Sequence, residues 1–335
     1  MENIMKVWFI DDCFTNKNTS REQKIELLEQ KGDVQITKIL PSQISSLRDS
    51  SDKDIDLIFI DFKLDADNGI FSVGSEVVSL VRALVPDTPL YLLSVETNDS
   101  EEYERVEGFE RRVGENYLSH PDKVKSDIKD HALLKYAITT KNTSLLMRDL
   151  FRAPDDVKED LDLSLPGTVR KFLMTENSSE GTLGPRVEFF RWFIDLFYQH
   201  PGFLLSEDAC AMYLGISVEY FRTIAHQFKD CLYEGAFFNT LLPRWWKSKI
   251  EDLIIAKDEN GLLNINSFNE ASSKILMAHE EHLARCVVCR DYWPDSLALV
   301  EGSNRSLHMV HIGCSEPDVD FNVGPYFQKP RMIKT

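Results

Sequence analysis

Residues Asp56 to Gly69 read Asp-Leu-Ile-Phe-Ile-Asp-Phe-Lys-Leu-Asp-Ala-Asp-Asn-Gly. The stretch contains an uninterrupted apolar run, Leu57 to Ile60, which ends at a carboxylate, Asp61. A short run that is rich in β-branched and aromatic residues is typical of a strand buried on both faces of a parallel sheet. In α/β sheets, ligands bind at the carboxyl ends of the strands. We therefore expect a functional site at Asp61, built with the polar residues that follow other strands.

Two other apolar runs also end in polar residues. A first strand expected at Lys6–Ile10 ends at Asp11 and Asp12, and a fourth strand expected at Leu90–Leu93 ends at Ser94. Three carboxylates that gather without a basic partner repel one another unless a hard cation lies among them. Mg²⁺ fits such a set because it takes oxygen ligands and keeps several waters. The Ser94 hydroxyl can then bind an oxygen of a phosphoryl group on the carboxylate of the third strand.

The rest of the first 140 residues alternates strands with helices. Beyond the three strands already placed, we expect strands at Val34–Leu40 and Tyr117–Leu118, and helices at Val73–Leu84, Glu101–Val113 and Asp122–Ile138. A repeated strand–helix pattern is typical of the doubly wound class. The sequence therefore predicts an α/β fold with a five-stranded parallel sheet.

The order and spacing of these residues resemble the receiver domain of two-component response regulators, which has a flavodoxin-like fold. On this resemblance, Asp61 is the phosphoacceptor and Gly69 is the glycine of the loop that follows it. Asp11 and Asp12 match the family's paired acids, which would hold Mg²⁺ together with Asp61 and the backbone carbonyl of Lys63. The resemblance implies a histidine kinase or another protein as a partner.

The resemblance also assigns switch residues. Ser94 matches the family's Ser/Thr switch position, and Tyr117 matches its switch aromatic. The family has a Lys just before a Pro after strand five, whereas this chain has His120 before Pro121. Because that Lys contacts the phosphoryl group, two alternatives stay open: a receiver that is phosphorylated, and a degenerate receiver that docks onto a protein without phosphorylation.

Composition sets limits on the whole chain. Its 335 residues suggest two or three domains. The sequence has no apolar run of membrane-spanning length and no basic-then-apolar leader, so we expect a cytoplasmic protein without a membrane partner. The formal net charge is −17, which repels nucleic acid unless a local basic face overrides it.

Breaks in periodicity predict the domain organisation. We expect a receiver-like domain at 1–140, a linker at 141–185, an all-helical domain at 186–283, and a zinc-binding module with a tail at 284–335. The linker assignment depends on the acidic residues and Pro154 in its first part and on the glycines, hydroxyl residues and Pro185 in its last part.

The segment Ser206–Ala225 resembles the helix-turn-helix of DNA-binding regulators. Gly215 lies at the turn, where a positive φ is needed, and Ser217 can cap the second helix. The candidate DNA contacts are Tyr220, Arg222, Thr223, Gln227 and Lys229, and a basic cluster at 244–249 is a candidate for contact with the DNA backbone. DNA affinity depends largely on Lys and Arg, and only two of the five named candidates are permanently positive. A scaffold that binds protein therefore remains the alternative.

The last part of the chain carries a spacing typical of a zinc site. Cys286 and Cys289 form a Cys-x-x-Cys pair, and His311 and Cys314 form a His-x-x-Cys pair. Zinc binds four such ligands tetrahedrally, and a two-residue gap lets one turn present both side chains. A Cys₃His set leaves no open position, so the predicted site is structural and resembles a treble-clef zinc knuckle. His308 is an alternative fourth ligand.

Together these patterns predict a regulatory protein rather than an enzyme. In the first hypothesis, phosphorylation of Asp61 shifts the switch residues and changes DNA, protein or homodimer contacts of the helical, zinc-containing region. In the second, a degenerate receiver docks onto a protein. A third, a Mg²⁺-dependent phosphatase, fits less well because haloacid-type phosphatases space their first-strand acids as Asp-x-Asp, whereas Asp11 and Asp12 are adjacent.

Overall fold

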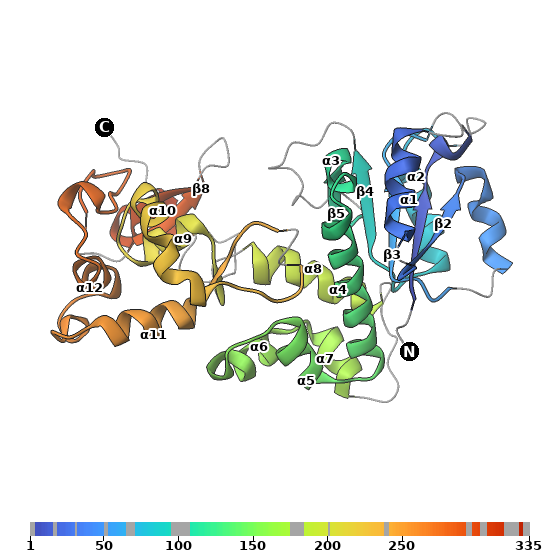
Figure 1. The fold of residues 1–335 in the computed structure, drawn as a ribbon. Helices are drawn as coiled ribbons and strands as arrows, with labels where there is room; N and C mark the ends of the chain where they lie inside the picture. Colours follow the sequence, from blue (N-terminus) through green and yellow to red (C-terminus); the bar gives the residue numbers. More distant parts are fainter. Residues whose placement is uncertain are drawn as a thin grey trace. The chain divides into compact units, whose positions relative to one another are not determined.

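The computed structural model describes residues 4–330 except 16–18, 31, 50–52, 65–70, 95–107, 175–183, 200–201, 238–240, 293–296, 302–306 and 318–327. The chain divides into two compact units (Figure 1). Unit 1 comprises Met1–Ala153, Asp160–Ile194 and Gly235–Leu241. Unit 2 comprises Pro154–Glu159, Asp195–Glu234 and Leu242–Thr335.

Unit 1 is built on a five-stranded sheet in which all neighbouring strands run parallel. Its strands are β1 (Met5–Ile10), β2 (Val34–Ile39), β3 (Leu57–Asp61), β4 (Leu90–Ser94) and β5 (Arg111–Gly114). The spatial order is β2-β1-β3-β4-β5, which is the order of the flavodoxin-like doubly wound fold. The predicted α/β class and parallel sheet are therefore confirmed.

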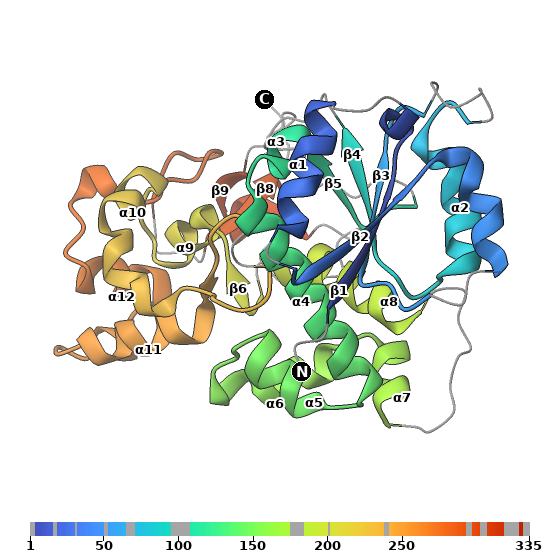
Figure 2. The same ribbon diagram turned by 45° about the vertical axis from the view of Figure 1, so that its right-hand side comes forward.

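Helices cover both faces of this sheet (Figure 2). Helices α1 (Ser20–Glu29) and α4 (Pro121–Thr139) lie on one face, and α2 (Gly74–Leu84) with the 3₁₀ segment η2 (Pro41–Asp49) lies on the other. All five residues of β3 are buried, as expected for a central strand covered on both sides. The site at its carboxyl end is therefore held by a rigid layer of strands.

The fifth strand was predicted in the wrong place. Tyr117 and Leu118 belong to a short helix, α3 (Glu115–Leu118), and β5 precedes it. Arg112 and Gly114 of β5 pair with Leu92 and Ser94 of β4. The true strand is rich in charged residues, so its apolar content did not reveal it. The end of the helix expected at Glu101–Val113 is thus strand, whereas residues 101–107 lie outside the described residues.

The segment expected to be a linker contains helices instead. It contains α5 (Thr143–Leu145), the π-helical turn η3 (Leu146–Leu150), the 3₁₀ turn η4 (Asp155–Val157), α6 (Lys158–Ser164) and α7 (Gly167–Met174). Leu146, Leu150 and Leu161 are fully buried. The next helix, α8 (Pro185–Trp192), packs against α7 and α4 within unit 1. The body built on the sheet therefore extends beyond the predicted boundary at residue 140.

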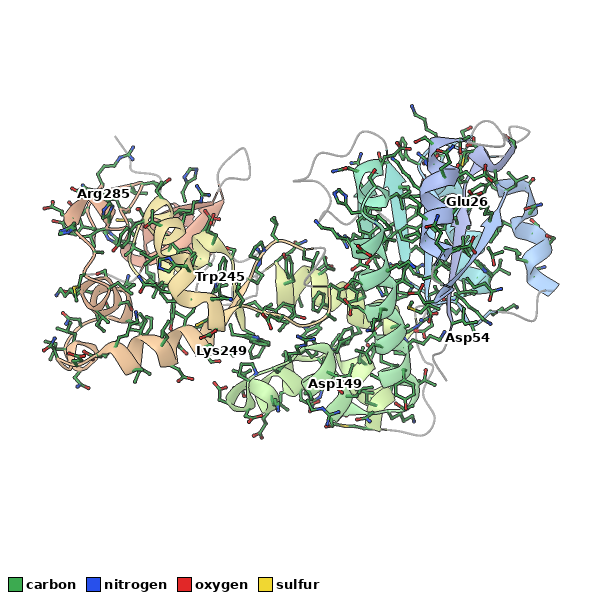
Figure 3. The ribbon with its side chains drawn as sticks, in the orientation of Figure 1. Glu26, Asp54, Asp149, Trp245, Lys249 and Arg285 are labelled. Carbon is green, nitrogen blue, oxygen red and sulfur yellow. The ribbon has the colours of Figure 1, made fainter. Side chains whose placement is uncertain are left out.

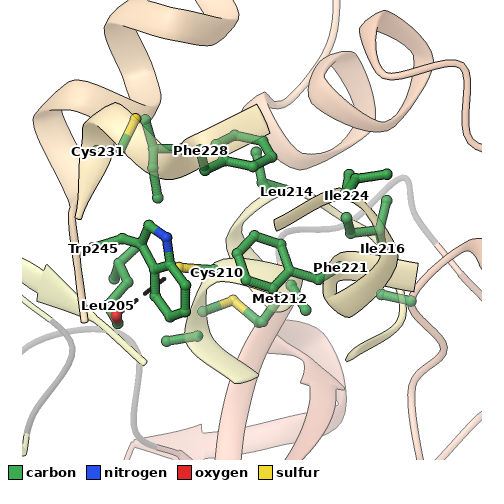
Figure 4. Packing of buried hydrophobic residues seen from close by; sticks show 14 of the residues in the cluster. Leu205, Cys210, Met212, Leu214, Ile216, Phe221, Ile224, Phe228, Cys231 and Trp245 are labelled. Atoms are coloured by element: carbon green, nitrogen blue, oxygen red, sulfur yellow. Dashed lines mark hydrogen bonds between the residues drawn. The ribbon is translucent and has the colours of Figure 1, made fainter. Parts of the chain in front are cut away.

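Unit 2 combines short helices with small two-stranded sheets. Its elements after η5 (Phe193–Tyr198) are β6 (Leu204–Leu205), α9 (Glu207–Tyr213), α10 (Val218–Ile224), η6 (Ala225–Cys231), β7 (Trp245–Trp246), α11 (Lys247–Lys257), η7 (Leu262–Asn264), α12 (Phe268–Ile275), η8 (Glu280–His282), β8 (Leu297–Glu301), β9 (Leu307–His311), η9 (Ile312–Cys314), β10 (Ser315–Pro317) and β11 (Gln328–Pro330). Its apolar core surrounds α9 and α10, where Cys210 and the rings of Phe221 and Trp245 lie close together (Figure 4).

The turn between α9 and α10 is tightly specified. Gly215 has a φ of 70°, in the left-handed region that favours glycine. A Cβ added there would lie 2.3 Å from the carbonyl oxygen of Asn269 on α12. Ser217 then caps α10, because its hydroxyl accepts the backbone N–H of Tyr220. The predicted roles of this Gly and this Ser in the turn are thus present.

We predict that Gly215→Ala destabilises unit 2 more than Gly261→Ala. Both glycines have a φ near 70°, but a Cβ at Gly261 would meet only the side-chain nitrogen of Asn264, at 3.3 Å. The control should cost about 1–2 kcal/mol from backbone strain. The Gly215 variant should cost about 1–3 kcal/mol more, because a backbone carbonyl must move. Urea denaturation followed by tryptophan fluorescence measures both, and equal losses would contradict the prediction.

Candidate functional site

The carboxylates predicted at the strand ends do meet. Oxygens of Asp11, Asp12 and Asp61 lie within 4.8 Å of one another at the carboxyl edge of the sheet. Asp11 is fully buried and Asp61 is only 6% exposed. Ser94 ends β4, beside β3, and is also buried. The sequence therefore predicted the composition of this acidic edge.

A basic side chain, Arg21, lies among these carboxylates. Its Nη1 is 2.7 Å from Oδ2 of Asp11 and 2.8 Å from Oδ1 of Asp61. Its Nε and Nη2 both donate to Oε1 of Glu115, at 3.0 and 2.9 Å. The guanidinium thus joins the ends of β1 and β3 to α3, and the expectation that the acids lack a basic partner is wrong.

Local helix chemistry explains why Arg21 depends on these acids. It is the second residue of α1, whose first turn is capped by the Thr19 hydroxyl accepting the N–H of Glu22. The positive end of a helix dipole disfavours a cation in this turn. The nearby carboxylates reverse that preference. An Arg in the first turn of the helix after strand one was the signal in the sequence that could have revealed it.

The electrostatics of Asp61 reflect competition between burial and pairing. Burial, with the adjacent charge of Asp11, raises the pKa of Asp61 to about 7, although the Arg21 charge acts in the opposite direction. Burial also opposes the charge on Arg21, yet the charges of Asp11 and Asp61 raise the pKa of Arg21 above its usual range. The guanidinium therefore stays charged, whereas the acid cluster holds fewer negative charges than its three carboxyl groups suggest.

Arg21 competes with a metal ion for this acidic cluster, whose carboxylate oxygens lie close enough together to hold one. Oδ2 of Asp11 and Oδ1 of Asp61 already bind Arg21. The other oxygen of Asp11 accepts the backbone N–H of Cys13 at 2.8 Å. Lys63, the expected carbonyl ligand, forms an isolated bridge with Val73. Gly69 lies outside the described residues, whereas Gly74 begins α2 so close to the Asp61 carbonyl that an added Cβ would lie 2.3 Å from it.

The expected switch residues each form hydrogen bonds with other partners. Ser94 does lie at the sheet edge, where its hydroxyl accepts a hydrogen bond from Arg112 at 3.1 Å. Tyr117 is buried and donates its hydroxyl to Asp127. His120 is exposed at the N-cap of α4, with its Nδ1 2.9 Å from the Asn116 carbonyl oxygen. Because β5 ends at Gly114, the residue directly after this strand is Glu115, and Tyr117 lies in the helix that follows.

Tyr117 belongs to a separate buried network between β5 and α4. Nη1 of Arg111 lies 2.7 Å from Oδ2 of Asp127, which also accepts the hydroxyl of Tyr117 at 2.7 Å. The hydroxyl of Tyr91 lies 2.8 Å from Nε2 of His131. Burial raises the pKa of both tyrosines well above the usual range and lowers the pKa of His131 well below it. A neutral imidazole therefore accompanies a charged Arg–Asp pair.

The DNA-contact candidates are largely occupied within unit 2. Arg222 pairs with Glu207 at 2.8 Å, and the ring of Tyr220 stacks on His282 with centroids 4.4 Å apart. Thr223 donates its hydroxyl to the Tyr220 carbonyl. Gln227 and Lys229 do not belong to α10, because they lie in the 3₁₀ segment η6, where Gln227 accepts from Lys257 and Lys229 is exposed.

The basic cluster is also engaged. Arg244 lies over the ring of Tyr198, Lys247 lies over that of Tyr213, and Lys249 donates to the Asp230 carbonyl. Figure 3 labels Trp245 and Lys249 of this cluster.

The zinc-ligand candidates come together as predicted. Ligand atoms of Cys286, Cys289, His311 and Cys314 lie within 4.8 Å of one another. Cys286 and Cys289 flank a turn, His311 ends β9, and Cys314 ends η9. His308 lies outside this group and is exposed, so it is not the fourth member.

Among the residues described, no helix is long and apolar enough to cross a membrane.

No protein-family model and no curated protein matches the chain. A structure of the RcsB response regulator of Salmonella typhimurium, concerned with its interaction with DNA, is 13% identical and covers 53% of this chain and 95% of its own, with a TM-score of 0.27. RcsB of Salmonella enterica serovar Typhimurium bound to promoter rprA with the phosphomimetic BeF₃⁻ is 14% identical, covers 51% and 98%, and has a TM-score of 0.28. The fold assignment rests on the strand order and register of the sheet itself.

We predict that Asp61 makes unit 1 less stable as pH rises from about 4 to about 7. Its pKa is about 7 in the folded chain, against the ordinary 3.8. The folded state therefore holds a proton that the unfolded chain has released, and this advantage disappears as pH approaches 7. The stability difference between wild type and Asp61→Asn should fall by about 2–4 kcal/mol across that window.

Chemical denaturation of both proteins at several pH values measures this difference. Taking the difference cancels the contribution of Asp130, whose pKa burial also raises to about 7. The exposed residue Asp122 supplies the control, because Asp122→Asn should keep the wild-type slope. A constant difference between wild type and Asp61→Asn from pH 4 to pH 7 would show that the Asp61 carboxyl titrates normally.

Proposed function

We propose that this chain is a regulatory adaptor whose receiver-like domain docks onto a protein partner without being phosphorylated at Asp61. The observation that carries this proposal is the ion pairing of Arg21 with Asp11, Asp61 and Glu115. In a phosphorylated receiver, the acids hold a metal ion and one carboxylate oxygen attacks the phosphodonor. Here a side chain of the protein itself already binds the oxygens that those steps require.

The charge pattern around Asp61 opposes a phosphoryl group in two further ways. A phosphoryl group adds about −1.5 to −2 charges at neutral pH and needs basic partners or a metal to offset them. Glu115, rather than a lysine, follows β5 and binds the same guanidinium as Asp61. The Ser94 hydroxyl, which would donate to a phosphoryl oxygen, accepts a hydrogen bond from Arg112. Asp61 and Ser94 are thus each bound to an arginine of this chain.

The energy of the arrangement favours a permanent state. The Arg21 side chain is 10% exposed, and the Asp11 and Asp61 side chains are 0% and 9% exposed. A Mg²⁺ ion that entered would have to displace the guanidinium from the carboxylates of Asp11 and Asp61. We therefore place the chain outside the class of phosphatases as well, and propose no catalytic role for the three acids.

A protein partner fits the electrostatics better than DNA. The net charge of −17 attracts a basic surface and repels phosphates. The helix pair α9–α10 has the turn of a helix-turn-helix, which is the observation that favours DNA contact. Arg222, however, is paired with Glu207, and Lys249 is hydrogen-bonded within unit 2. The partner class that we propose for the whole chain is therefore a protein with a basic face, a histidine kinase included.

We predict that the wild-type chain gains no phosphoryl group from a small phosphodonor with Mg²⁺. Intact mass spectrometry measures the addition, with Asp61→Asn as the blank. Arg21→Ala should bind Mg²⁺ at least about tenfold more tightly than wild type, because the acids lose their internal cation. Lys24→Ala is the matched control on the same helix, since the ion pair of Lys24 within the described part of the chain is with Glu115, at 4.0 Å.

The opposite result for the wild type would reject the adaptor proposal. One phosphoryl group on wild type that is missing from Asp61→Asn would identify a working receiver in which Arg21 moves aside.

We also predict no DNA binding above the non-specific level. Fluorescence anisotropy of a labelled random duplex at about 150 mM salt should show a Kd no tighter than about 10⁻⁴ M, the weak end of non-specific binding at physiological salt. A tighter complex that weakens steeply with salt would favour the alternative output. In that case Arg222→Ala should reduce the salt dependence, because the number of phosphates neutralised sets its slope.

A further inference from the structure

We infer that Cys286, Cys289, His311 and Cys314 hold one structural Zn²⁺. We further infer that this ion fastens the hairpin of β8 and β9 to the turn between α9 and α10. The inference concerns unit 2 alone and does not depend on the proposed function of the receiver-like domain. Three cysteines and one histidine supply the ligand atoms, and backbone hydrogen bonds connect the segment before Cys286 to the turn between α9 and α10.

The distances suit a tetrahedral ion. The four ligand atoms lie within 4.8 Å of one another, and Nδ1 of His311 lies 3.3 Å from Sγ of Cys289. Zinc–sulfur and zinc–nitrogen bonds of about 2.3 and 2.0–2.1 Å place tetrahedral ligand atoms about 3.5–3.8 Å apart. The observed spacing therefore requires only small side-chain adjustments. Three thiolates and one imidazole complete the coordination shell, so no position remains for substrate or water.

Hydrogen bonds hold the turn at the first cysteine pair. The backbone N–H of His311 donates to Sγ of Cys286 at 3.4 Å. The N–H of Arg290 donates to the Cys286 carbonyl at 2.9 Å, and Arg290 has a φ of 69°. These bonds keep the Cys286 sulfur beside the end of β9, where His311 lies.

The choice of histidine gives a second, independent observation. His311 is 5% exposed, and its Nε2 has no hydrogen-bond partner among the described residues, whereas its Nδ1 faces Cys289. A metal ion that binds Nδ1 would account for the nitrogen that faces the cysteine and would leave the ring proton on Nε2. His308, three residues earlier on β9, is exposed and lies outside the cluster.

Backbone contacts link this cluster to the helix pair. Just before Cys286, the segment 282–284 pairs with the turn between α9 and α10. The Ser217 N–H donates to the His282 carbonyl at 2.7 Å, and the Ala284 N–H donates to the Gly215 carbonyl at 3.1 Å. After the first cysteine pair, Met309 of β9 enters the core around α9 and α10. An ion bound by Cys286 and Cys289 and by His311 and Cys314 therefore holds segment 282–284 and β9 together against the helix pair.

The chemistry of the set selects zinc. Thiolate and imidazole ligands in a tetrahedral arrangement suit Zn²⁺, whereas Mg²⁺ and Ca²⁺ take oxygen ligands. The rest of the module has little apolar core of its own, since the described buried cluster there contains only Cys286 and Val310. A metal can supply the folding energy that such a small core lacks.

The test compares two histidines on one strand. The full-length chain and its variants His311→Gln and His308→Gln are purified with zinc and reductant, and zinc content is measured by elemental analysis. Cobalt then replaces zinc, and the visible spectrum reports tetrahedral thiolate coordination. Wild type and His308→Gln should retain one metal ion per chain with the same cobalt spectrum. His311→Gln should retain less metal, and its cobalt spectrum should change because one ligand is missing.

Hydrogen exchange measures the predicted link to the helix pair. Removal of zinc by a chelator should speed exchange of the amides of Ser217 and Ala284 by at least about tenfold, while those in the middle of β3 change little. A metal-free wild type, or equal metal retention in the two histidine variants, would overturn the site. Zinc bound with unchanged exchange at Ser217 and Ala284 would overturn the fastening role, which is part of the inference.

Discussion

Three carboxylates and one guanidinium at the carboxyl edge of the sheet set the conditions for the rest of unit 1. The arrangement is stable only while Arg21 reaches Asp11, Asp61 and Glu115 at once. The start of α1, the ends of β1 and β3, and α3 must therefore stay within a few ångströms of one another. An external cation would leave with a chelator or a change in concentration, whereas Arg21 is covalently part of the chain. The edge thus carries its own cation, which is why we propose docking rather than phosphorylation.

A second buried charge pair, Arg111 with Asp127, joins β5 to α4. Arg111 is 1% exposed and Asp127 is fully buried. The rings of Tyr91 and Tyr117 face Arg111, and their hydroxyls donate to Asp127. Such a pair adds little net stability compared with a hydrophobic core, but removal of either partner leaves an uncompensated charge. The network therefore fixes which part of the chain becomes the fifth strand. A slip of β5 by one residue would direct Arg111 away from α4.

The sequence predicted those features that depend on local composition. The strands β1, β3 and β4 are apolar runs, and their polar ends meet because parallel strands share an edge. The cluster of three cysteines and one histidine followed from spacing alone. The position of β5 could not be predicted this way, because its charged residues are explained only by a partner on α4. Arg21 was missed for a similar reason, since its carboxylates lie up to 94 residues away in the chain. The helices at 141–174 are short, so they lack the long periodicity that reveals a helix.

The segment Gly235–Leu241 has a consequence for the order of events during synthesis. The Phe237 N–H donates to the carboxylate of Asp130 on α4, and its ring packs on His131 and Phe190. Unit 1 therefore takes residues from both ends of a stretch that also contributes to unit 2. As the ribosome releases the chain, α4 emerges about a hundred residues before Phe237. The sheet can form early, but one side of α4 stays uncovered until that later segment arrives, so a chaperone has a defined interval in which to bind.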